Sequence, residues 1–490
     1  MKTGTFIKLT DLSGDHRVHK TLVYLICLAF LLANAWLIPK ENYYLALLPV
    51  ALAVVYLAIY RFDWIYWATL FAVPFSFPLK ELAPGLGFNL LLPTEPLLAG
   101  ILVIFLIRLA LDGGLDRRVI SHPITWIILL MIFWILITSI TSTMPLVSFK
   151  YLASRLWYVV AFYFLAIVFF SDARNIRKFL WVLLIPLSFM VVVITLKHMS
   201  LGLFDQKASN PAVDPFFNDH TLYGAIMALF LPVAGGYLIR SPLSLLQKAG
   251  VLVVFILLLT GLVFSYSRAA WVSVAGAIGV MVIILFKIPG KVVILGLALT
   301  VVAFMVFGKS VLMQMERNDQ DSSDNLMEHV QSISNVSTDA SNLERLNRWS
   351  CALRMWAEKP LFGWGPGTYM FQYAPFQKAS QKTIISTNAA DGGNAHSEYL
   401  GPMSEMGLPG GLLMLALVIY SIITAVKVFH REKSAEMKMV ALTVLMGLVS
   451  YYLHGILNNF LDTDKASAGL WGFLAILVAL DIRNDRESVT

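Results

Sequence analysis

The sequence predicts an all-α membrane protein that crosses the bilayer many times. Of its 490 residues, 58% are hydrophobic and only 14% are charged, whereas soluble domains have about one quarter of their residues charged. Apolar runs of about 20 residues, the length that a spanning helix needs, recur along the chain. The runs are continuously apolar rather than alternating, which excludes a transmembrane β-barrel. The first run lacks a small-residue cleavage site, so we interpret it as a retained helix and not as a signal peptide.

Hydropathy predicts 12–14 transmembrane helices. The third candidate is short and the fourth contains Arg108, so twelve full crossings with re-entrant or tilted pieces fit as well as fourteen. The candidates are 21–38, 42–60, 64–78, 95–111, 123–141, 151–170, 178–197, 221–239, 249–265, 269–286, 291–308, 408–427, 438–456 and 466–482.

Basic residues predict the sidedness of these spans, because cytoplasmic loops are rich in Lys and Arg. Lys and Arg precede the first span and then recur in every second connection and after the last span, so both termini are expected in the cytoplasm. The net charge of +7 is explained by these short loops, and we expect no nucleic-acid partner. The connections expected on the outer face are 39–41, 79–94, 142–150, 198–220, 266–268, 309–407 and 457–465.

We therefore divide the chain into spans at 1–308, one large periplasmic loop at 309–407, and C-terminal spans with a cytoplasmic tail at 408–490. A connection of that length is far longer than usual and points to function. Within it, apolar residues at three- and four-residue spacing predict an amphipathic helix from Ser341 to just before Pro360.

Ionisable residues at the predicted outer face are the candidate functional residues, because charges at or within spans are costly. Arg155 lies at the outer end of a span, where a snorkelling interfacial arginine is equally plausible. Arg268 lies in a connection so short that its side chain must face the mouth of the bundle. His220 precedes a span, and His396 lies near the end of the large loop.

His396 is the candidate general base, because imidazole titrates near neutral pH and can accept a proton from a hydroxyl. Arginines on the same face can hold a diphosphate through forked hydrogen bonds. Trp364 and Tyr369, in a Gly/Pro-rich turn, fit either stacking on a sugar ring or anchoring at the membrane interface.

The sequence indicates no metal and no cofactor. Asp462-Thr-Asp464 has the spacing of an Asp-x-Asp metal motif but directly follows a span, and a phosphate-binding loop for ATP is missing. Cys27 and Cys351 form no metal or redox motif.

Three segments together resemble the bacterial O-antigen ligase family, which includes related polysaccharide polymerases. These are Ser265-Tyr-Ser-Arg268-Ala-Ala-Trp271, Arg345-Leu-Asn-Arg-Trp349 with Lys359-Pro-Leu-Phe-Gly-Trp-Gly-Pro-Gly367, and Asn394-Ala-His396-Ser-Glu-Tyr-Leu400. The family's motif of a histidine, ten residues and a glycine is met by His396 and Gly407. The similarity covers roughly residues 120–480, with Ala269 where a glycine is often found.

The resemblance implies a GT-C-type glycosyltransferase of the bacterial inner membrane. Its donor would be a glycan on undecaprenyl diphosphate, its acceptor a sugar hydroxyl of the lipid A core, and its reaction metal-independent and inverting. By analogy His396 is the base, and Arg155 and Arg268 bind the donor diphosphate. Further substrate-binding candidates are Arg345, Arg348, His220, Trp364, Tyr369 and Tyr399.

Two other functions remain open. The chain could polymerise glycan repeat units or attach a glycan to protein, because the sequence does not identify the acceptor. A transporter of lipid-linked sugar ranks last, because the polar residues gather at one face and no internal repeat is evident.

Overall fold

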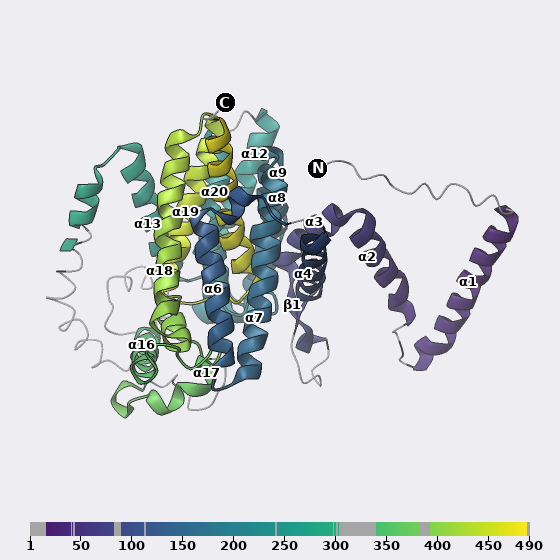
Figure 1. Ribbon diagram of the computed structural model, residues 1–490, viewed down its shortest axis with the longest axis horizontal. Helices are drawn as coiled ribbons and strands as arrows, with labels where there is room; N and C mark the ends of the chain where they lie inside the picture. Colours follow the sequence, from purple (N-terminus) through teal and green to yellow (C-terminus); the bar gives the residue numbers. More distant parts are fainter. Residues whose placement is uncertain are drawn as a thin grey trace. The chain divides into compact units, whose positions relative to one another are not determined.

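The protein is almost entirely helical in the computed structural model, with one short antiparallel sheet (Figure 1). The structure describes residues 16–40, 42, 45–82, 90–111, 114–240, 243–296, 298–299, 302, 340–382, 386 and 393–487. The chain divides into two compact units, Met1–Ile65 and Tyr66–Thr490. The second unit contains every candidate functional residue.

The longer helices are α1 (His16–Leu37), α2 (Leu48–Tyr60), α3 (Phe62–Ala72), α4 (Thr94–Leu111), α6 (Pro123–Ile140), α7 (Pro145–Val159), α9 (Ala173–Leu201), α11 (His220–Arg240), α12 (Leu245–Val263), α13 (Arg268–Leu285), α16 (Ala340–Glu358), α18 (Leu400–Arg431), α19 (Ala435–Leu457) and α20 (Asp464–Glu487). The short helices are α5 (Arg117–Ile120), α8 (Ala166–Phe170), α10 (Ser209–Val213) and α17 (Tyr369–Gln372), and a π-helical stretch, η5 (Val160–Leu165), joins α7 to α8. Short 3-10 turns are η1 (Ile38–Lys40), η2 (Leu45–Leu47), η3 (Val73–Phe75), η4 (Leu79–Glu81), η6 (Gln206–Ala208), η7 (Ala374–Phe376) and η8 (Ala379–Gln381). The sheet pairs β1 (Phe77–Pro78) with β2 (Leu91–Leu92).

Eleven helical segments among the described residues are long and apolar enough to cross a membrane. They confirm the predicted all-α, multi-pass membrane class. The eleven are Val23–Lys40, Thr94–Leu111, Pro123–Ile140, Pro145–Phe170, Ala173–Leu201, His220–Ile239, Leu245–Val263, Arg268–Leu285, Leu400–Arg431, Ala435–Leu457 and Asp464–Arg486.

Two predicted spans are shorter than expected. The candidate at 42–60 contains α2, which has 13 residues, and the candidate at 64–78 contains α3, which has 11. Helix α3 ends at Ala72 because Pro74 follows in a 3-10 turn and lacks the amide hydrogen that a continuing helix would use. The candidate at 291–308 lies largely outside the described residues, so the total of 12–14 stays a prediction.

Helices α11, α19 and α20 form the interior of the second unit. The share of residues buried is 83% in His220–Ile239, 83% in Ala435–Leu457 and 94% in Asp464–Arg486. Figure 1 shows α18, α19 and α20 running side by side. Polar residues at the ends of these helices therefore face other protein segments rather than lipid.

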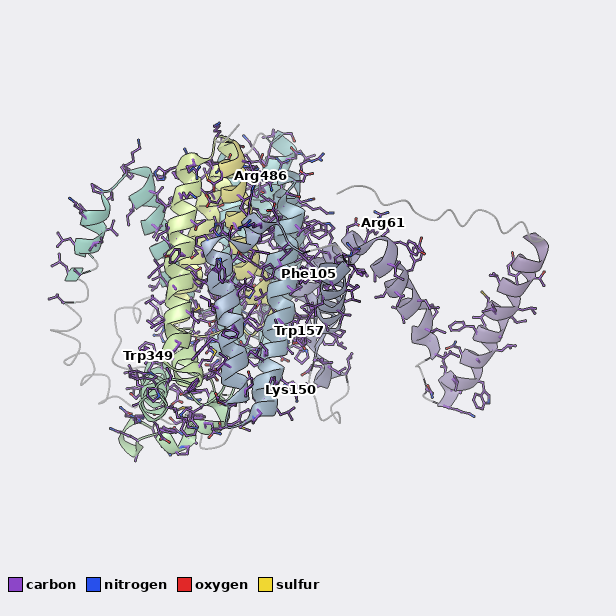
Figure 2. The ribbon with its side chains drawn as sticks, in the orientation of Figure 1. Arg61, Phe105, Lys150, Trp157, Trp349 and Arg486 are labelled. Atoms are coloured by element: carbon purple, nitrogen blue, oxygen red, sulfur yellow. The ribbon has the colours of Figure 1, made fainter. Side chains whose placement is uncertain are left out.

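The connections gather at the two ends of the helix bundle in the alternating sets that the sequence predicts. At one end, which we call the site end, the Thr143 amide donates to the Trp364 carbonyl (3.1 Å) and Thr94 Oγ1 donates to Asp464 (2.7 Å). At the other end, Arg177 pairs with Glu436, Arg483 with Glu432, and Arg486 with Asp116. Figure 2 shows Lys150 and Trp349 toward the first end and Arg486 at the other. Which end faces the periplasm stays a prediction.

Candidate functional site

The segment after α16 docks onto the site end through backbone hydrogen bonds. The carbonyl of Trp364 accepts from the backbone amide and the hydroxyl of Thr143, and the carbonyl of Pro366 accepts from Ser148 Oγ (2.9 Å). On its other side, the Gly365 amide donates to the Glu405 carbonyl (2.8 Å). The Gly/Pro turn at 363–367 is thus held between the α6–α7 connection and the start of α18.

Helix α18 kinks at Gly407, which has φ +69° and ψ −172° inside the helix. A Cβ atom on Gly407 would collide with the carbonyl of Leu361, and the Leu408 amide donates to the Pro360 carbonyl across the same contact (2.8 Å). The kink separates residues 400–406, which belong to the site, from the apolar continuation predicted at 408–427. Gly407, the second member of the histidine–glycine motif, therefore acts through its backbone, because the missing side chain lets the Leu361 carbonyl approach closely.

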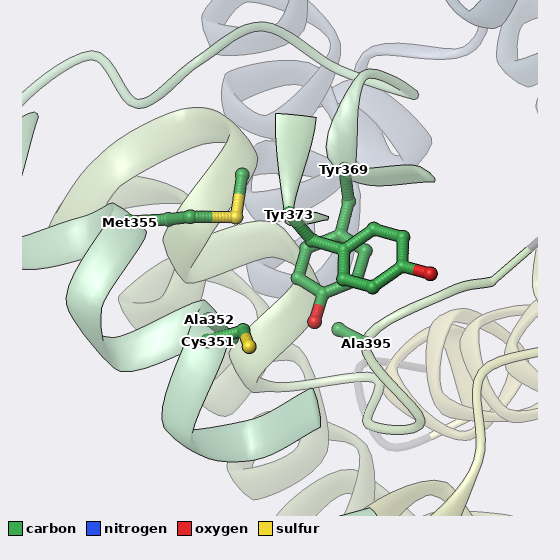
Figure 3. Packing of buried hydrophobic residues seen from close by; sticks show 6 residues of the cluster. All are labelled: Cys351, Ala352, Met355, Tyr369, Tyr373 and Ala395. Atoms are coloured by element: carbon green, nitrogen blue, oxygen red, sulfur yellow. The ribbon is translucent and has the colours of Figure 1, made fainter. Parts of the chain in front are cut away.

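His396 is fixed by its own backbone. It has φ +47°, an unusual value for a residue other than glycine. Its amide donates to Asn394 Oδ1 (3.0 Å), and its carbonyl accepts from Trp349 Nε1 of α16 (3.1 Å). The preceding residue, Ala395, packs against the buried face of α16 beside Tyr373, as Figure 3 shows. Constraints on both sides of His396 leave its partly buried imidazole little freedom to move.

The end of α19 supplies a hydrogen-bonded chain behind His396. The side chain of Asn458 is a hydrogen-bond partner of the His396 imidazole, and its Nδ2 lies 3.1 Å from His454 Nε2. Asn458 and His454 are 3% and 1% exposed, so water does not compete for these bonds. With Nδ2 donating to His454, Asn458 Oδ1 is free to accept from one ring nitrogen of His396. That arrangement leaves the lone pair of the other ring nitrogen for a substrate.

Positive charge surrounds His396. Arg345 on α16 donates from Nε to the Leu457 carbonyl (3.3 Å), and the charges of Arg345 and Arg348 act on the imidazole. Burial, followed by these two guanidinium charges, lowers the pKa of His396 to about 4. The imidazole is therefore neutral at pH 7 and available as a base.

Arg268 and His220 join this group from α13 and α11. The charge of Arg268 interacts with that of Arg345, and the charge of Arg345 also acts on His220. His220 Nδ1 lies 2.6 Å from the Ser265 carbonyl and donates to it, so Nε2 carries the ring's lone pair. The structure thus brings together His396, Arg268, Arg345 and His220, four of the candidates named from the sequence.

Arg155 lies on the wall of a cavity of about 360 Å³ at the site end. Its guanidinium donates to the Leu461 carbonyl (3.1 Å) and to the Tyr151 hydroxyl (2.5 Å), and it is 7% exposed. Asp462 and Glu398 are its closest acidic neighbours by charge interaction. Arg155 is not a snorkelling interfacial residue, because its charge is enclosed by protein.

The remaining candidates have structural partners. Arg348 pairs with Glu344 (2.7 Å) and lies over the ring of Tyr373, where a Cβ on Gly393 would collide with its guanidinium. Arg348 therefore holds the segment that leads into His396. Tyr399 donates to the Tyr452 carbonyl (2.9 Å).

The two aromatic candidates are used in packing. Trp364 donates from Nε1 to the Met355 carbonyl (3.0 Å), and Lys359 lies over its ring. Tyr369 is 2% exposed, stacks on Tyr373 and donates to the Arg348 carbonyl (Figure 3). These contacts occupy the ring face of Tyr369 and give both residues a packing role within the docked segment.

Sequence reasoning missed several residues of the site. Glu398 Oε1 accepts from the Tyr451 hydroxyl and from the amides of Phe460 and Leu461, which closes the α19–α20 connection over the cavity. Glu405 accepts from the Tyr369 amide (2.9 Å). The sequence feature that could have identified Glu398 and Glu405 is a carboxylate within or beside an apolar run. Among the described residues, no group of three or more His, Cys, Asp or Glu side chains is placed to hold a metal ion.

Comparison with known families gives one match. The family model described as O-antigen ligase matches residues 253–415, which contain Arg268, Arg345 and His396. The match is narrower than the resemblance seen in the sequence and ends before Asn458. It supports assignment of the chain to the O-antigen ligase family. No curated protein matches the chain significantly.

Proposed function

We propose that this member of the O-antigen ligase family transfers a glycan from undecaprenyl diphosphate to a sugar hydroxyl of the lipid A core. The acceptor oxygen attacks the anomeric carbon as its proton passes to His396. The bond between that carbon and the diphosphate oxygen breaks, and the lipid diphosphate leaves with the electron pair. Attack opposite the leaving group inverts the anomeric centre, and no metal is required.

The observation that carries the proposal is a neutral histidine held between a cavity and two arginines. A base with a pKa near 4 is unprotonated at neutral pH, yet it lies beside cations that can bind an anion. Preorganised charges of this kind stabilise negative charge that develops on a leaving group. A merely structural histidine would not need two arginine charges next to it.

We assign the donor diphosphate to Arg268 and Arg345. The charge of Arg345, on α16, acts on the His396 imidazole and also on Arg268 of α13. Two like charges kept together favour a doubly charged anion, which relieves their repulsion. Arg155, the other expected ligand of the diphosphate, already donates to Tyr151 and Leu461, and we place it with the cavity instead.

Replacing Arg345 by Gln should reduce transfer about tenfold to a hundredfold, because one charge-assisted contact with the diphosphate is lost. Kinetics with varied donor and fixed acceptor would measure it, and Arg268→Gln should behave alike. Lys378→Gln, an exposed charge change at η8, is the control. Equal loss in the control, or unchanged donor kinetics in Arg345→Gln, would contradict the assignment.

The reaction is tested by supplying the purified protein with a lipid-diphosphate glycan and two acceptors in separate assays. We expect transfer to lipid A core with release of lipid diphosphate. Transfer only to a second molecule of donor would show a polymerase of the same family, and transfer only to a polypeptide a protein glycan ligase. Movement of intact donor across a membrane without bond cleavage would show a transporter.

We further propose that the site end faces the periplasm from the inner membrane, with both termini in the cytoplasm. In a Cys27→Ala background, Lys378→Cys at the site end should react with an impermeant thiol reagent applied from the periplasmic side. Lys433→Cys, exposed at the other end, should react only after the inner membrane is opened. Cys351 is buried and should remain silent. The reverse pattern would overturn the orientation.

A further inference from the structure

The cavity beside Arg155 is built from parts of the chain that are distant in sequence. Its walls include Arg155 of α7, Asp219 before α11, Asn394, Glu405 of α18 and Asp462 before α20. Its volume of about 360 Å³ lies within the roughly 300–1,000 Å³ of small-molecule sites. Asn394 and Ala395, the two residues before His396, also line it, so the cavity opens next to the candidate base.

The charged side chains of this cavity are mostly acidic, and they lie beside the amides of Asn218, Asn394 and Asn459. The carboxylates of Asp219, Glu405 and Asp462 line it, whereas Arg155 has its guanidinium engaged by Tyr151 and Leu461. A diphosphate would face several carboxylates for one cation, and like charges brought together cost several kcal/mol. The cavity is therefore unsuited to the donor's charged group.

Asn459 provides a second, independent sign of a ligand. Its Oδ1 is buried on the cavity wall and has no hydrogen-bond partner within the described part of the chain. A buried acceptor without a donor is costly, and a hydroxyl group from a ligand would satisfy it. Carboxylates and an amide carbonyl together match the hydroxyl groups of a sugar ring, each of which donates one hydrogen bond.

We propose that this cavity is the acceptor subsite and that it takes an uncharged, hydroxyl-rich sugar ring. The diphosphate of the donor then lies at Arg268 and Arg345. The assignment rests on the proposed function, because it names where the acceptor of that reaction binds.

The kinetic test uses Glu405→Gln in the full-length protein. Glutamine keeps one oxygen for the backbone amides of Tyr369 and Gly367, but it replaces the second carboxyl oxygen, the acceptor that a sugar hydroxyl would meet, with an amide donor. We expect the KM for lipid A core to rise about tenfold, with the donor KM unchanged within about twofold. Glu358→Gln, an exposed change on α16, is the matched control. A rise in the donor KM with the acceptor KM unchanged would overturn the proposal.

A labelling test separates failure of the subsite from failure of the whole reaction. Met370 lines the cavity, and Met370→Cys in a Cys27→Ala background gives a thiol there for an uncharged maleimide. Delipidated core oligosaccharide should slow the labelling several-fold, and inorganic pyrophosphate should not. Protection by pyrophosphate alone, or by neither compound, overturns the subsite even if transfer occurs. Protection by the oligosaccharide without any transfer keeps the subsite and rejects the proposed reaction.

Discussion

His396→Ala is expected to reduce glycan transfer by about 10²–10⁴-fold, the usual contribution of a general base. The variant should remain folded, because the hydrogen bonds of the backbone amide and carbonyl at position 396 are kept and only the side-chain bond to Asn458 is lost. Transfer assayed with purified protein, alongside its thermal unfolding, measures both. His430→Ala, an exposed histidine at the other end of the bundle, should retain full activity. Full activity in His396→Ala would remove this residue from the mechanism.

The pH dependence of glycan transfer is a second test of His396 as the general base. The base must be unprotonated, so the rate should stay level as the pH falls and should decline only near the His396 pKa of about 4. An ordinary histidine would lose activity near pH 6.5. In Arg345→Gln the acidic limb should move to higher pH, because one of the charges that disfavour the imidazolium is removed. A decline at pH 6–7 in the unaltered protein would mean that His396 is not the titrating base.

Gly407→Ala is expected to destabilise the protein by about 2–5 kcal/mol, because it adds both backbone strain and a steric clash. The glycine has φ +69°, and a Cβ would meet the Leu361 carbonyl that docks the preceding segment onto α18. Transfer should be lost as well, since displacement of this contact shifts the site end as a whole.

The measurement for Gly407→Ala is thermal unfolding in detergent, followed by transfer at a temperature where the variant is folded. Gly279→Ala on α13 is the matched control. A Cβ there meets nothing within 4 Å, and alanine is the better helix former by about 1 kcal/mol. Equal stability of the two variants would show that the kink tolerates a side chain.

The sequence was sufficient for the fold class and for the core of the candidate site. Long apolar runs have few structural alternatives, and the alternating basic loops placed Arg268 and His396 on one end. The helix at α16 was also predicted, because apolar residues at helical spacing and a terminating proline are local signals. Topology predicted that Arg268 and His396 lie at the same end, whereas Arg345 was named only through the family resemblance.

What the sequence could not show depends on contacts between distant segments. The docking of the Gly/Pro turn was not predicted, because Thr143, which donates to the Trp364 carbonyl, lies 221 positions earlier and gives no local signal. Asn458 escaped notice as the last residue of an apolar stretch, although the fold places it behind His396. Glu405 was missed because one carboxylate near an apolar run does not reveal which cavity it lines. Proline at position 74 was visible, but its effect on the third predicted span was not anticipated.

The docking of the Gly/Pro turn has a consequence for recombination between related proteins. Trp364 and Pro366 bind the α6–α7 connection through carbonyl oxygens, which every residue possesses. The side chains at positions 364 and 366 can therefore diverge without loosening these bonds, whereas Gly363 and Gly365 cannot change, because a Cβ atom there would collide with the Glu405 backbone and with Ser142. A one-residue insertion or deletion on either side would misalign all of these bonds. A chimera that exchanges the large loop should therefore also exchange residues 142–148, because the two segments bind each other although they lie far apart in the sequence.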